Sequence, residues 1–196
     1  VNDAPVLDDI LPQITDEDII LTLDLSASDI DSEDITFSAL VDGNGSASIE
    51  GTLLTVTPDE NYNGDIQVTV QASDGELTGQ TSFILTVTPV NDAPVLDDIL
   101  PQTTDEDIAL TLDLTANDIE GNPLSFSAFV DGNGSASVDG TLLTVIPASD
   151  YNGDIQVTVE VSDGELTGQT SFILTVNAVN DAPVLDDILP QITDEN

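Results

Sequence analysis

The chain has 196 residues, with 39 Asp and Glu side chains and no Lys, Arg or His, so its formal net charge at pH 7 is −39. Nothing in it can neutralise phosphate, and an anionic lipid surface would repel it, so the composition excludes nucleic acid and direct membrane contact. Because 39% of the residues are hydrophobic, unlike those of a disordered acidic tail, we expect a folded protein with an acidic surface.

The absence of Cys and His restricts the metal chemistry that is open to this chain. Zinc and copper sites lose their usual ligands, and only carboxylate, amide and hydroxyl oxygens remain, which suit Ca²⁺. No apolar run approaches membrane-spanning length and the chain opens without a signal peptide. We therefore expect an internal part of a longer, secreted protein.

The phrase VNDAPVLDDILPQITDE opens the chain, nearly recurs at Val90 and returns unchanged at Val179. The spacing predicts a repeat in residues 1–89, a second repeat in 90–178 and the start of a third in 179–196. A unit of about ninety residues is too long for most solenoid repeats and suits one small β-domain.

Within the first repeat the apolar residues alternate with polar ones, which predicts strands over residues 20–27, 34–40, 65–73 and 81–87. The segments DGNG at Asp42–Gly45 and EG at Glu50–Gly51 are typical of hairpin turns between strands. We expect about seven short strands per repeat and no helix. This pattern predicts an all-β chain of two tandem Greek-key β-sandwiches, followed by the first strand of a third.

The acids gather at predicted loops and strand ends rather than along the strands. In the first repeat they form the groups TDED, SDIDSED, PDENYNGD and SDGE, and each junction adds the Asn-Asp of VNDAP. Two carboxylates about 4 Å apart repel by roughly 4 kcal/mol at an effective dielectric constant near 20. Clustered acids are therefore costly unless a metal ion lies between them.

The whole repeat resembles the cadherin repeat, and more closely the VNDAP-type, immunoglobulin-like cadherin repeats of large bacterial surface adhesins. SASDID resembles the Ala-x-Asp-x-Asp motif of that family, and VTVQASDGELTG resembles its Val-x-Ala-x-Asp strand and loop. VNDAPV resembles the linker, and Glu17 stands where cadherins keep the acid of their first strand. The linker lacks the leading acid of the full cadherin phrase, so we expect fewer than three ions per junction.

The resemblance implies Ca²⁺ ligands in three groups. The central junction would use Glu17, Asn61, Asn91, Asp92, Asp118, Glu120 and Asp163. The first repeat would offer Asn2, Asp3, Asp29, Asp31 and Asp74 toward a preceding domain. The second repeat would offer Glu106, Asp150, Asn180 and Asp181 toward a following one.

Simpler interpretations stay open for these motifs. SDID and NDIE are also typical of acidic loops in which Asx turns cap their own backbone. TDED is also typical of a charged edge that prevents strand pairing between molecules. NYNGD is more typical of a turn with Tyr62 packed beneath it, and the prolines Pro5, Pro94 and Pro183 favour a stiff junction.

Catalysis is not expected. Paired carboxylates could serve glycoside hydrolysis, but these acids recur at junctions in both repeats, and the chain holds only two Tyr and five Phe for a sugar platform. We therefore expect extender repeats of an extracellular biofilm adhesin, stiffened by Ca²⁺, with neighbouring repeats as partners. The alternative is a self-assembling filament or sheath, in which residues 179–196 complement another copy of the chain. A polysaccharide- or ice-binding module would need a flat Thr-rich or aromatic face, which the sequence does not predict.

Overall fold

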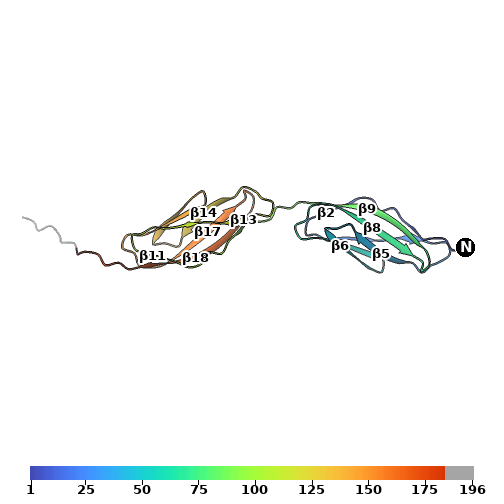
Figure 1. Cartoon of the computed structure of the whole chain (residues 1–196), viewed down its shortest axis with the longest axis horizontal. Coiled ribbons are helices and arrows are strands. Elements are labelled where there is room, and N and C mark those ends of the chain that lie inside the picture. The colour runs from blue at the N-terminus through green and yellow to red at the C-terminus, as the bar shows by residue number, and fades with distance from the viewer. Residues whose placement is uncertain (184–196) are drawn as a thin grey trace, which may run out of the picture. The chain divides into compact units, whose positions relative to one another are not determined.

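The computed structural model describes residues 1–183, which form two compact units divided after Asn91 (Figure 1). The expected first strand of a third repeat falls largely on residues 184–196 and lies outside the described residues. Strands but no helix occur in residues 1–183, and no helix there could span a membrane. The all-β expectation is therefore confirmed for the described part of the chain.

Within residues 1–183, each unit contains nine strand segments. In the first unit they are β1 (Val6–Leu7), β2 (Gln13–Asp16), β3 (Leu21–Asp24), β4 (Ala27–Ser28), β5 (Thr36–Val41), β6 (Gly45–Glu50), β7 (Leu53–Pro58), β8 (Gly64–Ser73) and β9 (Thr78–Thr88). In the second they are β10 (Val95–Leu96), β11 (Gln102–Asp105), β12 (Leu110–Asp113), β13 (Ala116–Asn117), β14 (Ser125–Val130), β15 (Gly134–Asp139), β16 (Leu142–Pro147), β17 (Gly153–Ser162) and β18 (Thr167–Asn177).

In both units seven of the strands form the two layers of a sandwich. The first unit pairs a four-stranded sheet, ordered β2-β9-β8-β5, with a three-stranded sheet, ordered β3-β7-β6, and the second unit repeats this order. In the larger sheet β2 runs parallel to its neighbour β9, and β11 runs parallel to β18 in the second unit. The other pairings in the two layers are antiparallel. A two-residue pair, β1 with β4, is additional to the seven expected strands.

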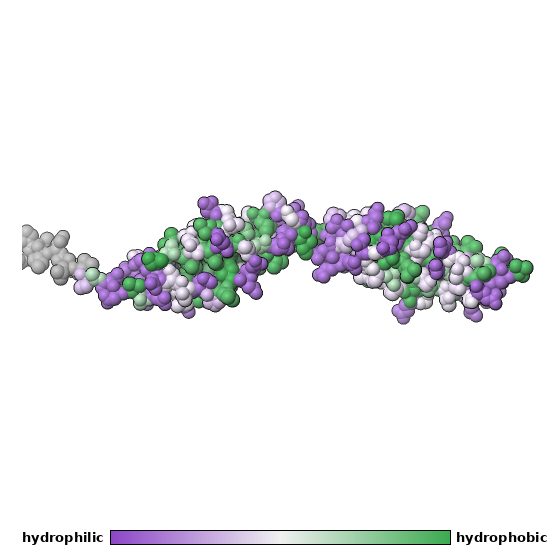
Figure 2. Space-filling model, in the orientation of Figure 1, coloured by the Kyte–Doolittle hydropathy of each residue, from purple (hydrophilic) through white to green (hydrophobic). Residues whose placement is uncertain are grey.

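The core lies between the two sheets because one apolar face of each strand is turned inward. Leu54, Val56, Ile66, Val68 and Leu85 are completely buried, and the same positions of the second unit are buried in the same way. Figure 2 shows hydrophilic and hydrophobic residues mixed over the visible surface of each unit. The exposed hydrophobic residues include Leu11 and Leu40.

The two predicted hairpin turns have different outcomes. The turn at Gly51 is a hairpin, since Glu50 pairs with Leu53 across it. The DGNG prediction is wrong, because β5 pairs with β8 and β6 pairs with β7, so the segment passes from one sheet to the other. Its first residue extends the β5–β8 ladder, with Asp42 N donating to Gln67 O, and its third, Asn44, accepts from Asp59 N. A turn motif alone does not say with which strand its flanks pair.

Candidate metal centre

Three separate segments of the first unit meet at one end of the sandwich. The leading segment supplies Asn2 and Asp3, the β4–β5 loop supplies Asp29 and Asp31, and the β8–β9 loop supplies Asp74. Asn2 Nδ2 donates to Asp74 Oδ2 at 2.8 Å, and Asp3 N donates to Asp31 Oδ2 at 2.9 Å. The structure thus brings together the five residues that the cadherin resemblance offers toward a preceding domain.

The fold sets this arrangement through the start of the last strand. The carbonyl oxygen of Pro5 lies so close to Gly79 that a Cβ on that glycine would stand 2.0 Å from it. The equivalent Gly168 makes the same approach to Pro94 in the second unit. Glycine therefore lets the leading segment lie against β9 and carries Asn2 to the β8–β9 loop.

The Asx turn at Asp29 uses only one of the two oxygens of that carboxylate. Its Oδ1 accepts the N–H groups of Asp31 and Ser32, each at 2.7 Å, as the simpler interpretation expects. Its Oδ2 is buried and has no hydrogen-bond partner. A buried carboxylate oxygen without a partner is costly, because it has lost water and gained nothing in return.

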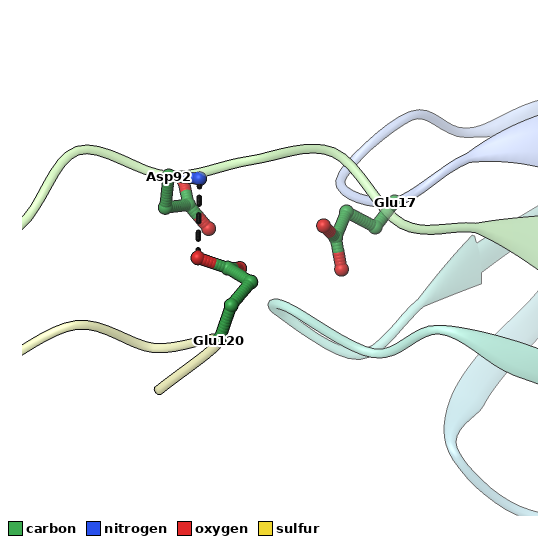
Figure 3. Close-up of side chains that lie close together, drawn as sticks. All are labelled: Glu17, Asp92 and Glu120. Carbon is green, nitrogen blue, oxygen red and sulfur yellow. Dashed lines mark hydrogen bonds between the residues drawn. The ribbon is translucent and has the colours of Figure 1, made fainter. Parts of the chain in front are cut away.

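The second unit repeats this feature with a different loop sequence. Asp118 Oδ1 accepts from Asn122 N at 2.8 Å, and Asp118 Oδ2 is buried without a hydrogen-bond partner. Asp92 N donates to Glu120 Oε2 at 3.3 Å, which Figure 3 shows, and carboxylate oxygens of Asp92 and Glu120 lie within 4.8 Å of one another. The same end of both sandwiches therefore concentrates negative charge around an unpaired oxygen.

Asp74 and its equivalent Asp163 accept backbone N–H groups of their own loops. Asp74 Oδ1 accepts the N–H groups of Leu77 and Glu76 at 2.7 Å each, and these bonds lower the pKa of Asp74 below its ordinary value. Asp163 Oδ1 accepts the corresponding two N–H groups at the same distances. Hydrogen bonds that stabilise the charged form keep a carboxylate available to a cation.

Glu17 and Glu106 lie at the other end of their domains. Glu17, also labelled in Figure 3, is only 4% exposed and Glu106 only 6%. Glu17 Oε1 accepts from Val90 N at 2.5 Å and its Oε2 from Asn63 Nδ2 at 3.4 Å, while Glu106 accepts from Val179 N. The 11-residue strand β9 separates this end from Asp74 by roughly 35 Å.

The sequence missed this structural task of the two glutamates, as well as the part of Asn63. Val90 follows directly after Pro89, so its N–H belongs to the segment that leaves the first domain, and a carboxylate that accepts it fixes this exit. Glu17 directly follows β2, which pairs parallel to β9. The alternation of apolar and polar residues does not show which strands pair, so it does not predict this role.

The remaining predicted ligands are placed as follows. Asn61 has a φ of 57° and its N–H donates to Asp18 Oδ1 at 3.0 Å, while Asp150 has a φ of 58° and donates to Asp107 in the same way at 3.2 Å. Both therefore serve the turn over the tyrosine, and Tyr62 packs against the core, as the structural interpretation of NYNGD expects. Asn91 is half-buried, Asn180 and Asp181 are exposed, and Asn180 Nδ2 donates to the Asp181 carbonyl at 3.1 Å.

No side chain of the protein offers a countercharge to these carboxylates, because the sequence has no Lys, Arg or His. The donor set is entirely oxygen, and it comes from several segments, as hard cations require. Asp29 Oδ2 and Asp118 Oδ2 are the oxygens that a cation would satisfy. The residues present therefore fit Ca²⁺ and offer nothing suited to a soft metal.

Comparisons with known proteins agree with the fold. The model of a family described as "Bacterial Ig domain" matches residues 2–88 and 91–177. A chitinase A of Pseudoalteromonas piscicida is 28% identical over 177 residues, which is 85% of this chain but 21% of that protein. The chain thus spans about a fifth of the length of the curated relative that it matches.

Among solved structures, two cadherin ectodomain fragments share the fold. Domains EC1-2 of human protocadherin-24 align with a TM-score of 0.54 and 16% identity, covering 92% of this chain and 100% of that one. Domains EC1-4 of Drosophila N-cadherin align with a TM-score of 0.51 and 17% identity, covering 91% and 50%. The expected likeness to cadherin-like tandem repeats is thereby confirmed at the level of fold.

Proposed function

The chain belongs to the bacterial immunoglobulin-like domain family, and from this premise we propose that its two domains are calcium-stiffened spacer repeats of a secreted surface protein. One observation carries the proposal. In both domains a buried carboxylate oxygen, that of Asp29 or Asp118, has no hydrogen-bond partner, and the chain contains no basic side chain that could neutralise it. An external cation is the remaining source of charge compensation.

In this proposal Ca²⁺ is bound where one domain joins the next. The residues that would hold the ion are Asn91, Asp92, Asp118, Glu120 and Asp163 of the linker and second repeat, together with Glu17 and Asn61 of the first repeat. When bound, the ion supplies positive charge that offsets the repulsion between these carboxylates. The residues of the chain do the rest: backbone N–H groups of their own loops orient Asp118 and Asp163, and the Val90 bond to Glu17 fixes the exit of the first domain.

The expected mechanical result is a linker that is loose without calcium and stiff with it. Extracellular calcium modules bind with dissociation constants of about 10⁻⁴–10⁻³ M, so the repeats would stiffen only outside a cell. The excess negative charge would also oppose side-by-side aggregation of the spacer. A distal domain of a longer protein would thereby be held away from the surface to which that protein is anchored.

The role proposed for these two domains is mechanical and not catalytic. Neither His nor Lys is available to activate a nucleophile, which leaves acyl transfer without its usual base. The relative named chitinase A shows that such domains also accompany a protein with an enzyme name. A spacer serves a catalytic domain as well as an adhesive one, so this relative is compatible with the proposal.

The direct test is a calorimetric calcium titration of the chain with matched variants. Asp29→Asn with Asp118→Asn should abolish most of the binding heat, because both unpaired oxygens are replaced. Glu50→Gln with Asp139→Asn changes two acids that end β6 and β15, and this control should bind Ca²⁺ like the parent chain. Absence of binding by the parent up to 10⁻² M calcium would refute the proposal. A polymer that grows with protein concentration would instead favour the filament alternative.

A further inference from the structure

The repeated phrase contains a segment, Asp8–Gln13, that the calcium proposal does not use. In the first domain this β1–β2 loop and the β3–β4 segment enclose a hollow of about 280 Å³. The second domain has a hollow of about 220 Å³ at the positions 89 residues later. We propose that this hollow is a docking site for a protein segment that carries an apolar side chain flanked by basic ones.

The lining of the hollow combines two chemistries. Ile10, Leu11, Leu23 and Leu25 give it an apolar interior, and Asp8, Asp9 and Asp24 add carboxylates to it. The same combination of leucines, one isoleucine and three aspartates lines the second hollow. Leu11 is 73% exposed and its equivalent Leu100 is 74% exposed, so each domain leaves a large apolar side chain open at this place.

The wall of the hollow is held in shape before anything binds. Asp8 N donates to Ser26 O at 3.0 Å, which ties the loop to the β3–β4 segment. Gln13 Nε2 donates to Leu11 O at 2.9 Å, which fixes the loop from its other side. The second domain repeats both bonds at the same distances, from Asp97 N to Thr115 O and from Gln102 Nε2 to Leu100 O. A preformed wall lowers the ordering cost of binding.

Size and charge select the occupant. Pockets for drug-sized ligands have volumes of about 300–1,000 Å³, so each hollow lies just below that range and can take one anchoring side chain. A second copy of this chain would bring a further charge of −39 and no basic group, so it is a poor occupant. An apolar interior beside three carboxylates is complementary to a Leu-like side chain with Lys or Arg on either side. This inference does not depend on calcium binding.

The test uses the peptide Ser-Lys-Ser-Leu-Ser-Lys-Ser and the isotopically labelled full chain, followed by NMR. In an extended peptide the two Lys and the Leu lie on one face, each about 7 Å from the next. The titration is run in about 0.15 M salt, where the Debye length of roughly 8 Å suppresses long-range attraction to the acidic surface, and in saturating calcium. Control peptides replace Leu by Ser or both Lys by Gln.

We expect shift changes that are centred on both hollows and saturate with the Leu/Lys peptide. The variant Leu11→Ser with Leu100→Ser should weaken binding about tenfold, because one buried leucine contact is lost at each site. The matched control is Leu40→Ser with Phe129→Ser, which removes two exposed apolar side chains outside the hollows and should bind as the parent does. Asp9→Asn with Asp98→Asn should weaken binding without touching the apolar interior.

Three results would overturn the inference. The first is no saturable shift at either hollow. The second is equal binding of the Ser-for-Leu peptide, with shifts spread over the acidic loops, which would indicate charge attraction alone. The third is equal binding of the Gln-for-Lys peptide, which would show that the carboxylates do not select the occupant. None of these results bears on calcium binding, so failure here leaves the proposed function to its own test.

Discussion

Replacing Asp118 by Asn should change the stability of the second domain in opposite directions without and with calcium. Asn keeps the oxygen that accepts from Asn122 N, and it removes the charge on the buried oxygen that has no partner. In EDTA the variant should therefore be more stable than the parent chain. With calcium it should be less stable, because the parent alone keeps the charged ligand.

The magnitudes follow from the geometry and from mass action. Asp118 Oδ2 is buried without a hydrogen-bond partner, and a buried polar atom left unpaired costs about 1–3 kcal/mol. We take the lower end, about 1 kcal/mol, for the relief that Asp118→Asn brings. For a domain of this length, 1 kcal/mol raises the melting temperature by about 4–8 °C. Calcium at 100 times its dissociation constant stabilises the parent by about 2.7 kcal/mol, which exceeds the relief and reverses the order.

The assay is thermal unfolding of both chains, followed by circular dichroism in EDTA and in about 10 mM calcium. Asp139→Asn serves as the control, because it removes one acid from the end of β15 and should shift the melting temperature little in either condition. If Asp118→Asn melts below the parent in EDTA and gains as much from calcium as the parent does, Asp118 is not a calcium ligand. Its task would then be to accept the Asn122 N–H within its loop.

The other predictions concern the packing and the ends of each domain. Leu54→Ala should lower the unfolding free energy of the first domain by about 2–5 kcal/mol, measured by urea unfolding, because Leu54 is fully buried; an unchanged midpoint would contradict the core described. Gly168→Ala should destabilise the second domain in EDTA by about 2 kcal/mol or more, because its Cβ would meet the Pro94 carbonyl oxygen; a stabilised variant would show that the leading segment is not held against β18. In EDTA, NMR titration of the Asp74 carboxylate should give a pKa below the ordinary value of about 4. The stabilising contribution of Asp74 is then complete above the ordinary pKa and is lost as the pH falls through the lower folded pKa. An ordinary pKa would contradict the bonds from Leu77 and Glu76.

Much of the fold could be predicted because the repeat and the two-residue alternation are local signals. Val68, Val70 and Leu85 alternate with polar residues in the sequence and are buried in the structure. Strand partners are not local signals. The DGNG segment therefore has the residues of a hairpin turn, although β5 pairs with β8 and β6 pairs with β7.

The candidate site could be predicted to the level of which acids gather, and no further. The resemblance to cadherin motifs implied that Asp29, Asp31 and Asp74 converge, and the structure brings them to one end of the domain with Asn2 and Asp3. The sequence gives no sign that one oxygen of Asp29 accepts backbone N–H groups while its other oxygen is buried without a hydrogen-bond partner. That distinction depends on loop conformation, which a pattern of residue types does not encode.

Stiffening of the junction between the two domains by calcium can be measured by small-angle X-ray scattering of the chain in EDTA and then in millimolar calcium. We expect a broad distance distribution in EDTA, and in calcium a longer, better defined maximum dimension that Asp118→Asn fails to reach. Identical curves in both solutions, with calcium binding shown separately, would contradict stiffening and leave calcium as a stabiliser of single domains.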